Sequence, residues 1–319
     1  MNRKVKWGIA GLGNIAHKFT SDLIITSNVD LIAVASSNLN RAKEFKNRYG
    51  AKKAYGSYDE LFEDKDVEVV YIASLNNHHK KMTLDALNAK KAVLCEKPMG
   101  MNTAEVNQMI VKSKNQNCFL MEGLWSRFNP AIKTAKKWTN EGRIGIPRFM
   151  YAEFSFYKLD VESSHRLMDP LKGGGALLDI GIYPLFLAYY MLGMPKKIKS
   201  RRVLGVTGVD IQTSMILEYD NASAMLYCGI TNPSDNSAKI CGTSGQIILP
   251  GRWHEAQSVK LINSTDVIKH ELPTDGNGFV EQIKEVNSCI ISRKIEGAWR
   301  HKNSKELAQL IETVKGVSY

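Results

Sequence analysis

The chain has 319 residues, 44% of them hydrophobic, and a formal net charge of +11. This length allows one large or two ordinary domains, and the longest apolar runs are far shorter than the roughly 20 residues of a membrane-spanning helix. No nucleic-acid-binding pattern accompanies the positive charge, so we expect no specific nucleic-acid partner and no membrane. The five cysteines are scattered and include no Cys-x-x-Cys pair, which excludes a zinc ribbon and favours reduced thiols in a cytoplasmic protein.

The most informative stretch lies near the N-terminus, where Val5–Ala10 reads as an apolar strand followed by a glycine turn and the start of a helix. Gly11 permits the tight turn, and Gly13 lets the backbone approach a pyrophosphate whose charge then lies at the helix N-terminus. Ala16 is small enough for the helix to pack on the strand. The pattern predicts a dinucleotide-binding turn. Its candidate cofactor-binding residues are Gly11, Leu12, Gly13, Asn14 and Ile15.

Alternating strands and helices continue to about Met121, which is typical of a parallel sheet with helices on both faces. Continuous apolar runs indicate buried strands, and capping pairs such as Ser57 with Glu60 indicate helix starts. The further predicted strands are Leu31–Ala35, Val67–Ala73, Ala92–Cys95 and Cys118–Met121. We therefore predict a Rossmann-type, dinucleotide-binding domain over residues 1–122.

The pattern then changes. A helix over Pro130–Asn140 and a long strand over Pro147–Tyr157 precede a triple glycine, a second helix and a series of short, closely spaced strands. Those strands are Val203–Val206, Ile211–Tyr219, Ala222–Ile230, Lys239–Gly242, Gln246–Leu249, Val259–Ile262 and Val267–Leu272. Helices over Gly278–Ser292 and Ser304–Val314 close the chain. We predict an α/β protein whose second domain, residues 123–319, is α+β with a large, open, mostly antiparallel sheet. The cleft between the domains is the default substrate site.

An NAD-preferring domain usually has an acidic residue at the C-terminal end of its second strand, where it binds the ribose hydroxyls. Asp30 has about the expected distance from Gly11 but lies at the other end of that strand. The strand ends instead in Ser36 and Ser37, with Arg41 one helical step beyond. Hydroxyls and a guanidinium suit a 2′-phosphate, so we expect NADP as the cofactor, with NAD as the alternative.

Lys97 follows a buried parallel strand, between Glu96 and Pro98, at the sheet edge where ligands bind. An ammonium in that place could lower the pKa of a neighbouring hydroxyl. The position predicts a catalytic lysine.

Asp179 and Tyr183 lie four residues apart on the predicted helix Ala176–Leu192, so they share one helix face. The triple glycine before this helix, Gly173–Gly175, would let the backbone approach a ligand closely. This pattern predicts a second cluster of chemically active side chains.

The adjacent pair His78-His79 could suggest a metal site. Two adjacent histidines at a helix start point in different directions, and no third ligand is evident. We therefore expect no metal.

Three segments together carry a resemblance to a known family: the glycine turn, Glu96-Lys97-Pro98, and Gly173–Pro184 with the sequence GGGALLDIGIYP. Over essentially its whole length the chain resembles the Gfo/Idh/MocA family, named after glucose–fructose oxidoreductase and inositol dehydrogenase. Val93–Arg127 and the tyrosine helix are most similar to the branch of dimeric dihydrodiol dehydrogenases and NADP-dependent D-xylose dehydrogenases. Inositol dehydrogenases have a histidine at the position of Tyr183, and the dihydrodiol branch tends to have an arginine at the position of Ser37.

The resemblance implies roles for individual residues. Lys97 and Tyr183 would be the catalytic pair, with Asp179 orienting the substrate or the tyrosine. Glu96 and Lys97 would contact the cofactor. The substrate cleft would be lined by His79, Trp125 and Arg127.

The implied activity is hydride transfer between a nicotinamide and a secondary alcohol or hemiacetal carbon of a sugar, polyol or cyclic diol. Two alternatives on the same fold stay open: an NAD-dependent glycoside hydrolase and a non-catalytic, cofactor-sensing regulator. The presence of both Lys97 and Tyr183 argues against the regulator. Tightly retained NAD after purification would favour the hydrolase.

The strand Pro147–Tyr157 is apolar on both of its alternating faces. Only one face is needed against the helices of its own domain, and an uncovered apolar patch usually marks an interface. We therefore expect a homodimer, or a dimer of dimers, formed through the outer face of the C-terminal sheet.

Overall fold

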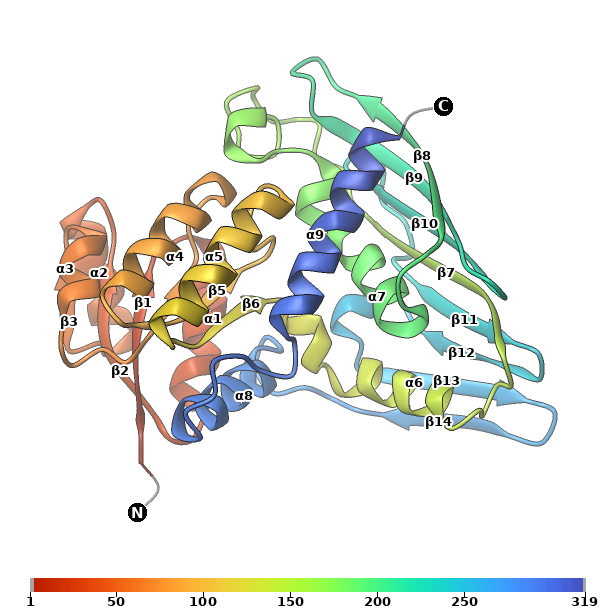
Figure 1. Ribbon diagram of the computed structural model, residues 1–319, viewed down its shortest axis with the longest axis horizontal. Coiled ribbons are helices and arrows are strands. Elements are labelled where there is room, and N and C mark those ends of the chain that lie inside the picture. The colour runs from red at the N-terminus through yellow and green to blue at the C-terminus, as the bar shows by residue number, and fades with distance from the viewer. Residues whose placement is uncertain (1–2, 318–319) are drawn as a thin grey trace. The chain divides into compact units, whose positions relative to one another are not determined.

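The computed structural model describes residues 3–317, which form two compact units. The first unit consists of the chain up to Trp125 together with Asp275–Lys305, and the second of Ser126–Thr274 together with the residues from Glu306 onward. This division differs from the single predicted boundary at residue 122, because a C-terminal segment returns to the first unit. Figure 1 labels the elements of both units.

The first unit is built on a parallel sheet with the strand order β3-β2-β1-β4-β5-β6. Its strands are β1 (Val5–Ala10), β2 (Val29–Ala35), β3 (Lys53–Tyr55), β4 (Val69–Ile72), β5 (Ala92–Glu96) and β6 (Leu120–Gly123). The order reverses between β1 and β4, which is the point where sheets of this kind bind ligands. The sequence did not predict the edge strand β3, because three residues are too few to show a period.

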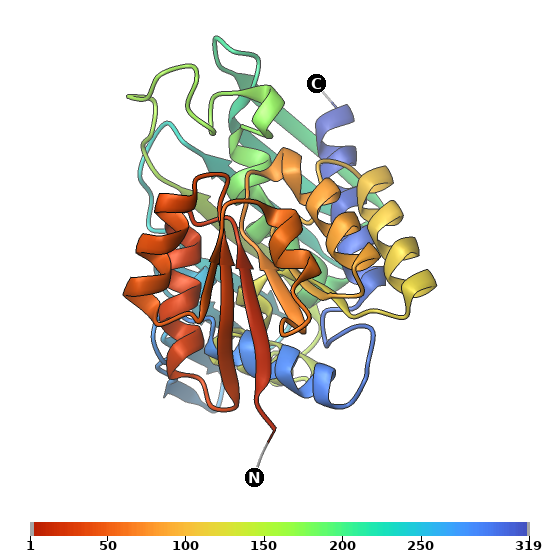
Figure 2. The same cartoon turned by 90° about the vertical axis from the view of Figure 1, so that its left-hand side faces the viewer.

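Helices cover both faces of this sheet, as Figure 2 shows. They are α1 (Asn14–Ile25), α2 (Leu39–Tyr49), α3 (Tyr58–Glu63), α4 (His79–Asn88) and α5 (Thr103–Gln116). The predicted capping box of Ser57 and Glu60 is present, and Gly50 ends α2 with a φ of 72°. The predicted parallel sheet with helices on both faces is confirmed.

The returning segment is fastened to the first unit by buried polar contacts. Helix α8 (Val280–Ile291) packs against α1 and β1. The buried Asp22 carboxylate on α1 accepts the backbone N–H groups of Asn277 and Phe279, both at 2.8 Å, and Trp7 Nε1 donates to Asn287 Oδ1 at 3.0 Å. Such partners lie hundreds of residues apart in the chain, so no local pattern predicts them.

The second unit is built on a larger sheet with the strand order β14-β13-β12-β11-β7-β10-β9-β8. Its strands are β7 (Pro147–Ser155), β8 (Lys197–Leu204), β9 (Asp210–Glu218), β10 (Ser223–Gly229), β11 (Ala238–Gly242), β12 (Gly245–Leu249), β13 (Ser258–Asn263) and β14 (Val267–Glu271). Strands β7 and β10 run parallel, and the other neighbouring pairs are antiparallel. The predicted mostly antiparallel sheet is confirmed.

The helices of the second unit lie against one face of that sheet (Figure 1). Helix α6 (Pro130–Asn140) packs on β12 and β13, and α7 (Ile182–Leu192) packs on β7 and β10. The later turns of α9 (His301–Gly316) run beside β8, where Ser200 Oγ donates to the carbonyl of Val314 at 2.8 Å. The segment Pro170–Leu192 is long and apolar enough to span a membrane, but 83% of its most apolar 18-residue window is buried inside the protein, as in a core helix.

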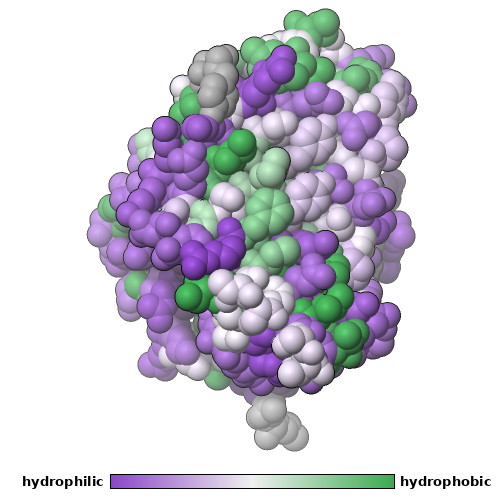
Figure 3. All heavy atoms as spheres, turned by 90° about the vertical axis from the view of Figure 1, so that its right-hand side faces the viewer, coloured by the Kyte–Doolittle hydropathy of each residue, from purple (hydrophilic) through white to green (hydrophobic). Residues whose placement is uncertain are grey.

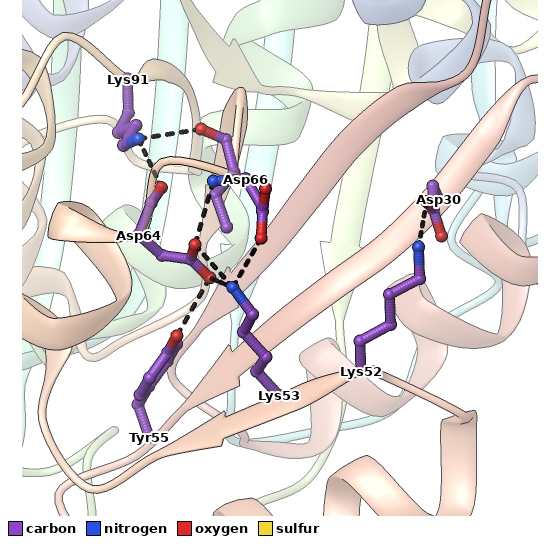
Figure 4. A network of polar contacts seen from close by, with 8 residues as sticks. Asp30, Lys52, Lys53, Tyr55, Asp64, Asp66 and Lys91 are labelled. Carbon is purple, nitrogen blue, oxygen red and sulfur yellow. Dashed lines mark hydrogen bonds and ion pairs between the residues drawn. The ribbon is translucent and has the colours of Figure 1, made fainter.

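A polar network joins β3 of the first unit to the segments that precede β4 and β5 (Figure 4). Lys53 Nζ donates to the carboxylates of Asp64 at 2.9 Å and Asp66 at 2.7 Å, and the Tyr55 hydroxyl donates to Asp64 at 3.0 Å. The Lys91 ammonium, which is largely buried, donates to the backbone carbonyl of Asp64 at 2.6 Å. The network stabilises the amino ends of β4 and β5, opposite the carboxyl edge where ligands bind.

Candidate functional site

The glycine turn between β1 and α1 leaves an open approach to the start of the helix. Gly11 has a φ of +91°, and an added Cβ would lie 2.8 Å from the backbone of Ala73, so only glycine fits this turn. At Gly13 an added Cβ would meet no atom of the described residues within 4 Å, and no side chain among them caps the helix. The first backbone N–H groups of α1 are therefore available to a phosphate, which fits a dinucleotide.

The end of β2 carries the residues predicted to distinguish NADP from NAD. The Arg41 guanidinium donates to the carbonyl of Leu12, so its positive charge is held beside the glycine turn. Ser37 is exposed, whereas Ser36 is buried and its Oγ accepts the N–H of Asn38 at 3.2 Å. Ser37 and Arg41 are thus accessible to a 2′-phosphate, and Ser36 belongs to the turn that presents them.

Asp30 lies at the amino end of β2, the end predicted for it. Its carboxylate pairs with Lys52 Nζ at 2.5 Å (Figure 4). Ligands of a parallel sheet bind at the opposite, carboxyl edge. Asp30 therefore does not occupy the position of a ribose-binding acid.

The turn after β5 presents Lys97 at the carboxyl edge of the sheet, and its Lys97–Pro98 peptide bond is cis. The Glu96 carboxylate faces the interior, where it accepts the Tyr71 hydroxyl and the N–H of Lys97, the latter at 3.2 Å. Burial raises the pKa of Glu96 to about 7. Lys97 itself is partly exposed. The Glu96 carboxylate is buried among protein groups, and its contact with the cofactor stays a prediction.

A second buried acid, Glu122 on β6, fastens the same turn. Its carboxylate accepts the N–H of Met99 at 2.9 Å and Trp299 Nε1 at 3.1 Å. Burial raises the pKa of Glu122, while the positive charge of Lys97 favours the ionised form of both acids. Glu96 therefore holds the backbone at Lys97, and Glu122 holds it two residues later at Met99.

His79 supports the lysine turn from within the first unit. Its side chain has no exposed surface, with Nδ1 2.8 Å from the carbonyl of Pro98 and Nε2 3.2 Å from the carbonyl of Ser74. Burial lowers the pKa of His79, so the ring is neutral near pH 7 and only one of its nitrogens carries a proton. We assign that proton to Nδ1, because Nδ1 makes the shorter contact with a carbonyl. The structure does not support the implied contact of His79 with substrate, because the ring is enclosed.

Trp125 and Arg127, the other implied cleft residues, belong to different units. Trp125 is buried, and its ring lies 5.1 Å from that of Phe279. The Arg127 guanidinium lies over the Tyr190 ring at 4.6 Å and is partly exposed. Their contact with substrate stays a prediction.

Tyr183 lies in the first turn of α7, but the helix before it is not the continuous α-helix predicted from the sequence. Leu177–Gly181 forms a single π-helical turn. An added Cβ at Gly181 would lie 2.7 Å from Cys228 Sγ, so the turn presses against β10. Single π-helical turns within helices occur frequently at functional sites.

Two aromatic side chains enclose the Tyr183 ring. Phe154 on β7 and His254, in the short 3₁₀ turn Trp253–Glu255, each have ring centroids 5.4 Å from that of Tyr183. Phe154 and His254 stack on each other at 4.1 Å. Tyr183 is only 5% exposed, so these packed rings, which form an aromatic wall, leave little of the phenol in contact with water.

Asp179, in the π-helical turn, is paired with a residue that sequence reasoning missed. Arg166 Nη1 lies 3.0 Å from Asp179 Oδ1, and Nη2 lies 3.4 Å from Oδ2. The Asp179 carboxylate is almost buried, and an unpaired charge there would be costly. This cost explains the ion pair, but it depends on the burial of Asp179, which the sequence does not show.

The triple glycine was predicted to let a ligand approach, but protein occupies that space. An added Cβ at Gly174 would lie 2.6 Å from the carbonyl oxygen of Leu167, and one at Gly175 would overlap the Asp210 carboxylate. Gly175 also has a φ of +105°, which only glycine adopts readily. The glycines therefore permit close packing within the second unit.

Comparison with known proteins matches both halves of the chain to one family. Its N-terminal profile, described as an oxidoreductase family with an NAD-binding Rossmann fold, matches residues 5–124, and its C-terminal domain matches residues 132–248. A trans-1,2-dihydrobenzene-1,2-diol dehydrogenase from Mus musculus is 40% identical over 260 residues, 80% of this chain and 77% of that protein. The chain belongs to the Gfo/Idh/MocA family. It is an NAD(P)-dependent oxidoreductase.

Solved structures of Gfo/Idh/MocA proteins share the fold over nearly the whole chain. The 3-ketoreductase KijD10 from Actinomadura kijaniata has a TM-score of 0.90 at 23% identity, and covers 99% of this chain and 98% of its own. An aldose–aldose oxidoreductase from Caulobacter crescentus has a TM-score of 0.90 at 24% identity, with the same coverage.

Residues 3–317 of this Gfo/Idh/MocA chain contain no cluster of three histidine, cysteine, aspartate or glutamate side chains that could hold a metal.

The side chains that sequence reasoning missed as parts of the site are Arg166, Phe154 and His254. They come from separate segments of the second unit and carry no common motif. Only their proximity in the fold identifies them.

Proposed function

We propose that this protein is an NADP-preferring dehydrogenase that transfers a hydride between the nicotinamide and a CH–OH carbon of a cyclic diol, sugar or polyol. The observation that carries this proposal is the setting of Tyr183, beside the aromatic wall and one turn beyond the ion-paired Asp179. An apolar aromatic surface suits the C–H face of a ring, and a carboxylate accepts hydrogen bonds from hydroxyls at the edge of that ring. The mouse relative, named for a cyclic diol, supports this substrate class.

The proposed chemistry divides between Tyr183 and Lys97. Bound NADP would supply the hydride acceptor for oxidation, and the substrate hydroxyl would then have to give up its proton to a group of the protein. A tyrosine has an ordinary pKa of roughly 10, too high for an efficient base near neutrality, and a nearby cation favours the phenolate. We assign general acid–base catalysis to Tyr183, electrostatic support to Lys97 and substrate orientation to Asp179.

The preference for NADP over NAD rests on the end of β2. Arg41 is held at the glycine turn, Ser37 is exposed, and Asp30 is paired elsewhere. A guanidinium binds phosphate oxygens with charge-assisted hydrogen bonds.

The described cysteines are free thiols, which supports the cytoplasmic location inferred from the sequence.

The decisive experiment is a panel of aldoses, polyols and cyclic diols with NADP and NAD, followed by the absorbance of the reduced nicotinamide. Tyr183→Phe should lower kcat about 100- to 10,000-fold with cofactor affinity nearly unchanged, because it removes a general acid–base group. Lys97→Met should lose at least as much, and the double variant little more, because the pair acts as a unit. Tyr189→Phe, on the same helix, is the control and should keep normal turnover.

Two outcomes would redirect this assignment. If Tyr183→Phe kept more than about a tenth of the wild-type kcat, the tyrosine would not be the proton-transfer group. Glycoside cleavage with permanently bound NAD and no net reduced cofactor would favour the hydrolase alternative instead.

We further propose a homodimer through the outer face of the second unit's sheet. Met225 on β10 and Ile216 on β9 are cross-strand neighbours, 50% and 40% exposed, and Tyr151 on β7 flanks Met225 on its other side. Figure 3 shows apolar side chains gathered near the middle of this face among hydrophilic ones. Such a patch is typical of an interface.

Light scattering at micromolar concentration should give the mass of a dimer or a tetramer. Met225→Lys should shift it toward the monomer, because a charge would be buried at the interface. Ile25→Lys places the same charge on an exposed apolar residue of the first unit and should leave the mass unchanged. A monomeric wild-type protein would refute the proposal.

A further inference from the structure

We propose that Arg166 is a positioning residue of the reaction, which holds the Asp179 carboxylate ionised and in one orientation for the substrate. The inference rests on the proposed function, since it takes Asp179 as the group that orients a substrate hydroxyl. Both residues belong to the second unit.

The geometry of the pair supports an orienting role. Two nitrogens of the planar guanidinium face the two carboxylate oxygens of Asp179, at 3.0 and 3.4 Å. Such a fork restricts rotation of the carboxyl group, whereas the single point charge of a lysine would not. The Asp179 side chain is 13% exposed and that of Arg166 is 47% exposed. The pair therefore lies at a surface that solvent, and hence a substrate, can reach.

The backbone around Arg166 is built to bring it to Asp179. The carbonyl of Leu167, the next residue, accepts the N–H of Gly175 at 2.8 Å, and Gly174 packs so closely on the same carbonyl that a side chain would not fit. On the other side, the Asp210 carboxylate accepts the N–H of Leu177 at 2.7 Å, at the start of the π-helical turn. The triple glycine thus joins the loop that carries Arg166 to the turn that carries Asp179.

The neighbouring cations have carboxylate partners of their own. Lys172 Nζ pairs with Asp169 at 2.9 Å, and Lys158 Nζ pairs with Asp160 at 3.8 Å. Removal of the guanidinium would leave the nearly buried Asp179 carboxylate to take up a proton or to turn toward other donors. Either change would remove an ionised, oriented acceptor from the site.

The test is a set of Arg166 variants assayed with the best substrate of the panel. Arg166→Ala should lower kcat/KM by about 10- to 100-fold, as expected for a lost charge-assisted hydrogen bond, and leave the Kd of NADP unchanged. Added guanidinium ion should restore part of the lost activity in Arg166→Ala, which a purely structural role would not allow. Arg166→Lys should be intermediate. Asp179→Asn combined with Arg166→Ala should be no worse than Asp179→Asn alone, because the two residues act as a unit.

Lys172→Gln, which removes the Lys172–Asp169 ion pair of the same loop, is the matched control and should keep wild-type kcat/KM. Full activity in Arg166→Ala, or no guanidinium rescue together with additive losses in the double variant, would overturn the inference. If Arg166→Ala does not fold, Arg166→Lys decides, and wild-type activity in it would overturn the inference. If the wild-type protein turned over no substrate, or Tyr183→Phe stayed active, the proposed function would fail and this inference with it.

Discussion

Gly13 and Gly174 occupy similar-looking segments, each in a glycine-rich run before a helix, but their surroundings differ. An added Cβ at Gly13 would meet no described atom within 4 Å, whereas at Gly174 it would lie 2.6 Å from the Leu167 carbonyl. The first glycine leaves room for a ligand, and the second lets one part of the protein pack on another. A glycine-rich segment therefore predicts a close approach but not what approaches.

The two acids next to the proposed catalytic residues, Glu96 and Asp179, also differ in what surrounds them. Glu96, beside Lys97, is buried and receives its hydrogen bonds from the neutral Tyr71 hydroxyl and a backbone N–H. Asp179, one turn before Tyr183, faces the guanidinium of Arg166. The first acid supports the turn that carries the lysine, and the second is the one still able to face a substrate.

The largest effect that this comparison predicts is the pH dependence of folding caused by Glu96. Its pKa is raised to about 7 in the folded protein, so the folded state holds a proton that the unfolded state releases at lower pH. The free energy of unfolding should therefore fall as pH rises from about 5 to about 8, by on the order of 3 kcal/mol from this group.

Urea unfolding of the wild type and Glu96→Gln at both pH values measures this term. Glu96→Gln should lose that part of the pH dependence, because it cannot ionise. An identical slope in the two proteins would show that Glu96 ionises in the folded state as it does in the unfolded chain.

The next effect separates the two glycines directly. Gly174→Ala should lower the free energy of unfolding by about 1–3 kcal/mol, the usual cost of overpacking, and lower kcat/KM through the Arg166–Asp179 pair. Gly13→Ala should change the free energy of unfolding by less than about 0.5 kcal/mol but weaken binding of either cofactor. Thermal unfolding and cofactor titration measure both quantities, and equal destabilisation in the two variants would contradict the comparison.

The remaining effect is confined to one cofactor and concerns the choice between NADP and NAD in the open turn. Arg41→Ala should lose roughly 1.5–3 kcal/mol of NADP binding, about tenfold or more in Kd, while NAD affinity stays nearly constant. Arg48→Ala, on the same helix, serves as the control. Fluorescence titration with both cofactors measures the effect, and equal losses for NADP and NAD would show that Arg41 does not bind the 2′-phosphate.

The sequence alone determined most of the cofactor half. Its signals are local: a glycine turn after an apolar strand, a capping box at Ser57, and the placement of Asp30 at the wrong end of its strand. Each depends on residues close together in the chain, whose spacing follows from helix and strand geometry. These features could therefore be predicted from the order of the amino acids.

Tertiary structure alone decided the rest. The return of Asp275–Lys305 to the first unit, the enclosure of His79 and the pairing of Arg166 with Asp179 depend on contacts between distant segments. The π-helical turn at Leu177–Gly181 arises where the helix packs against β10, so helix periodicity could not predict it. A residue's type states which chemistry it can perform, but burial and partners, which only the fold supplies, determine whether it faces a ligand or holds the protein together.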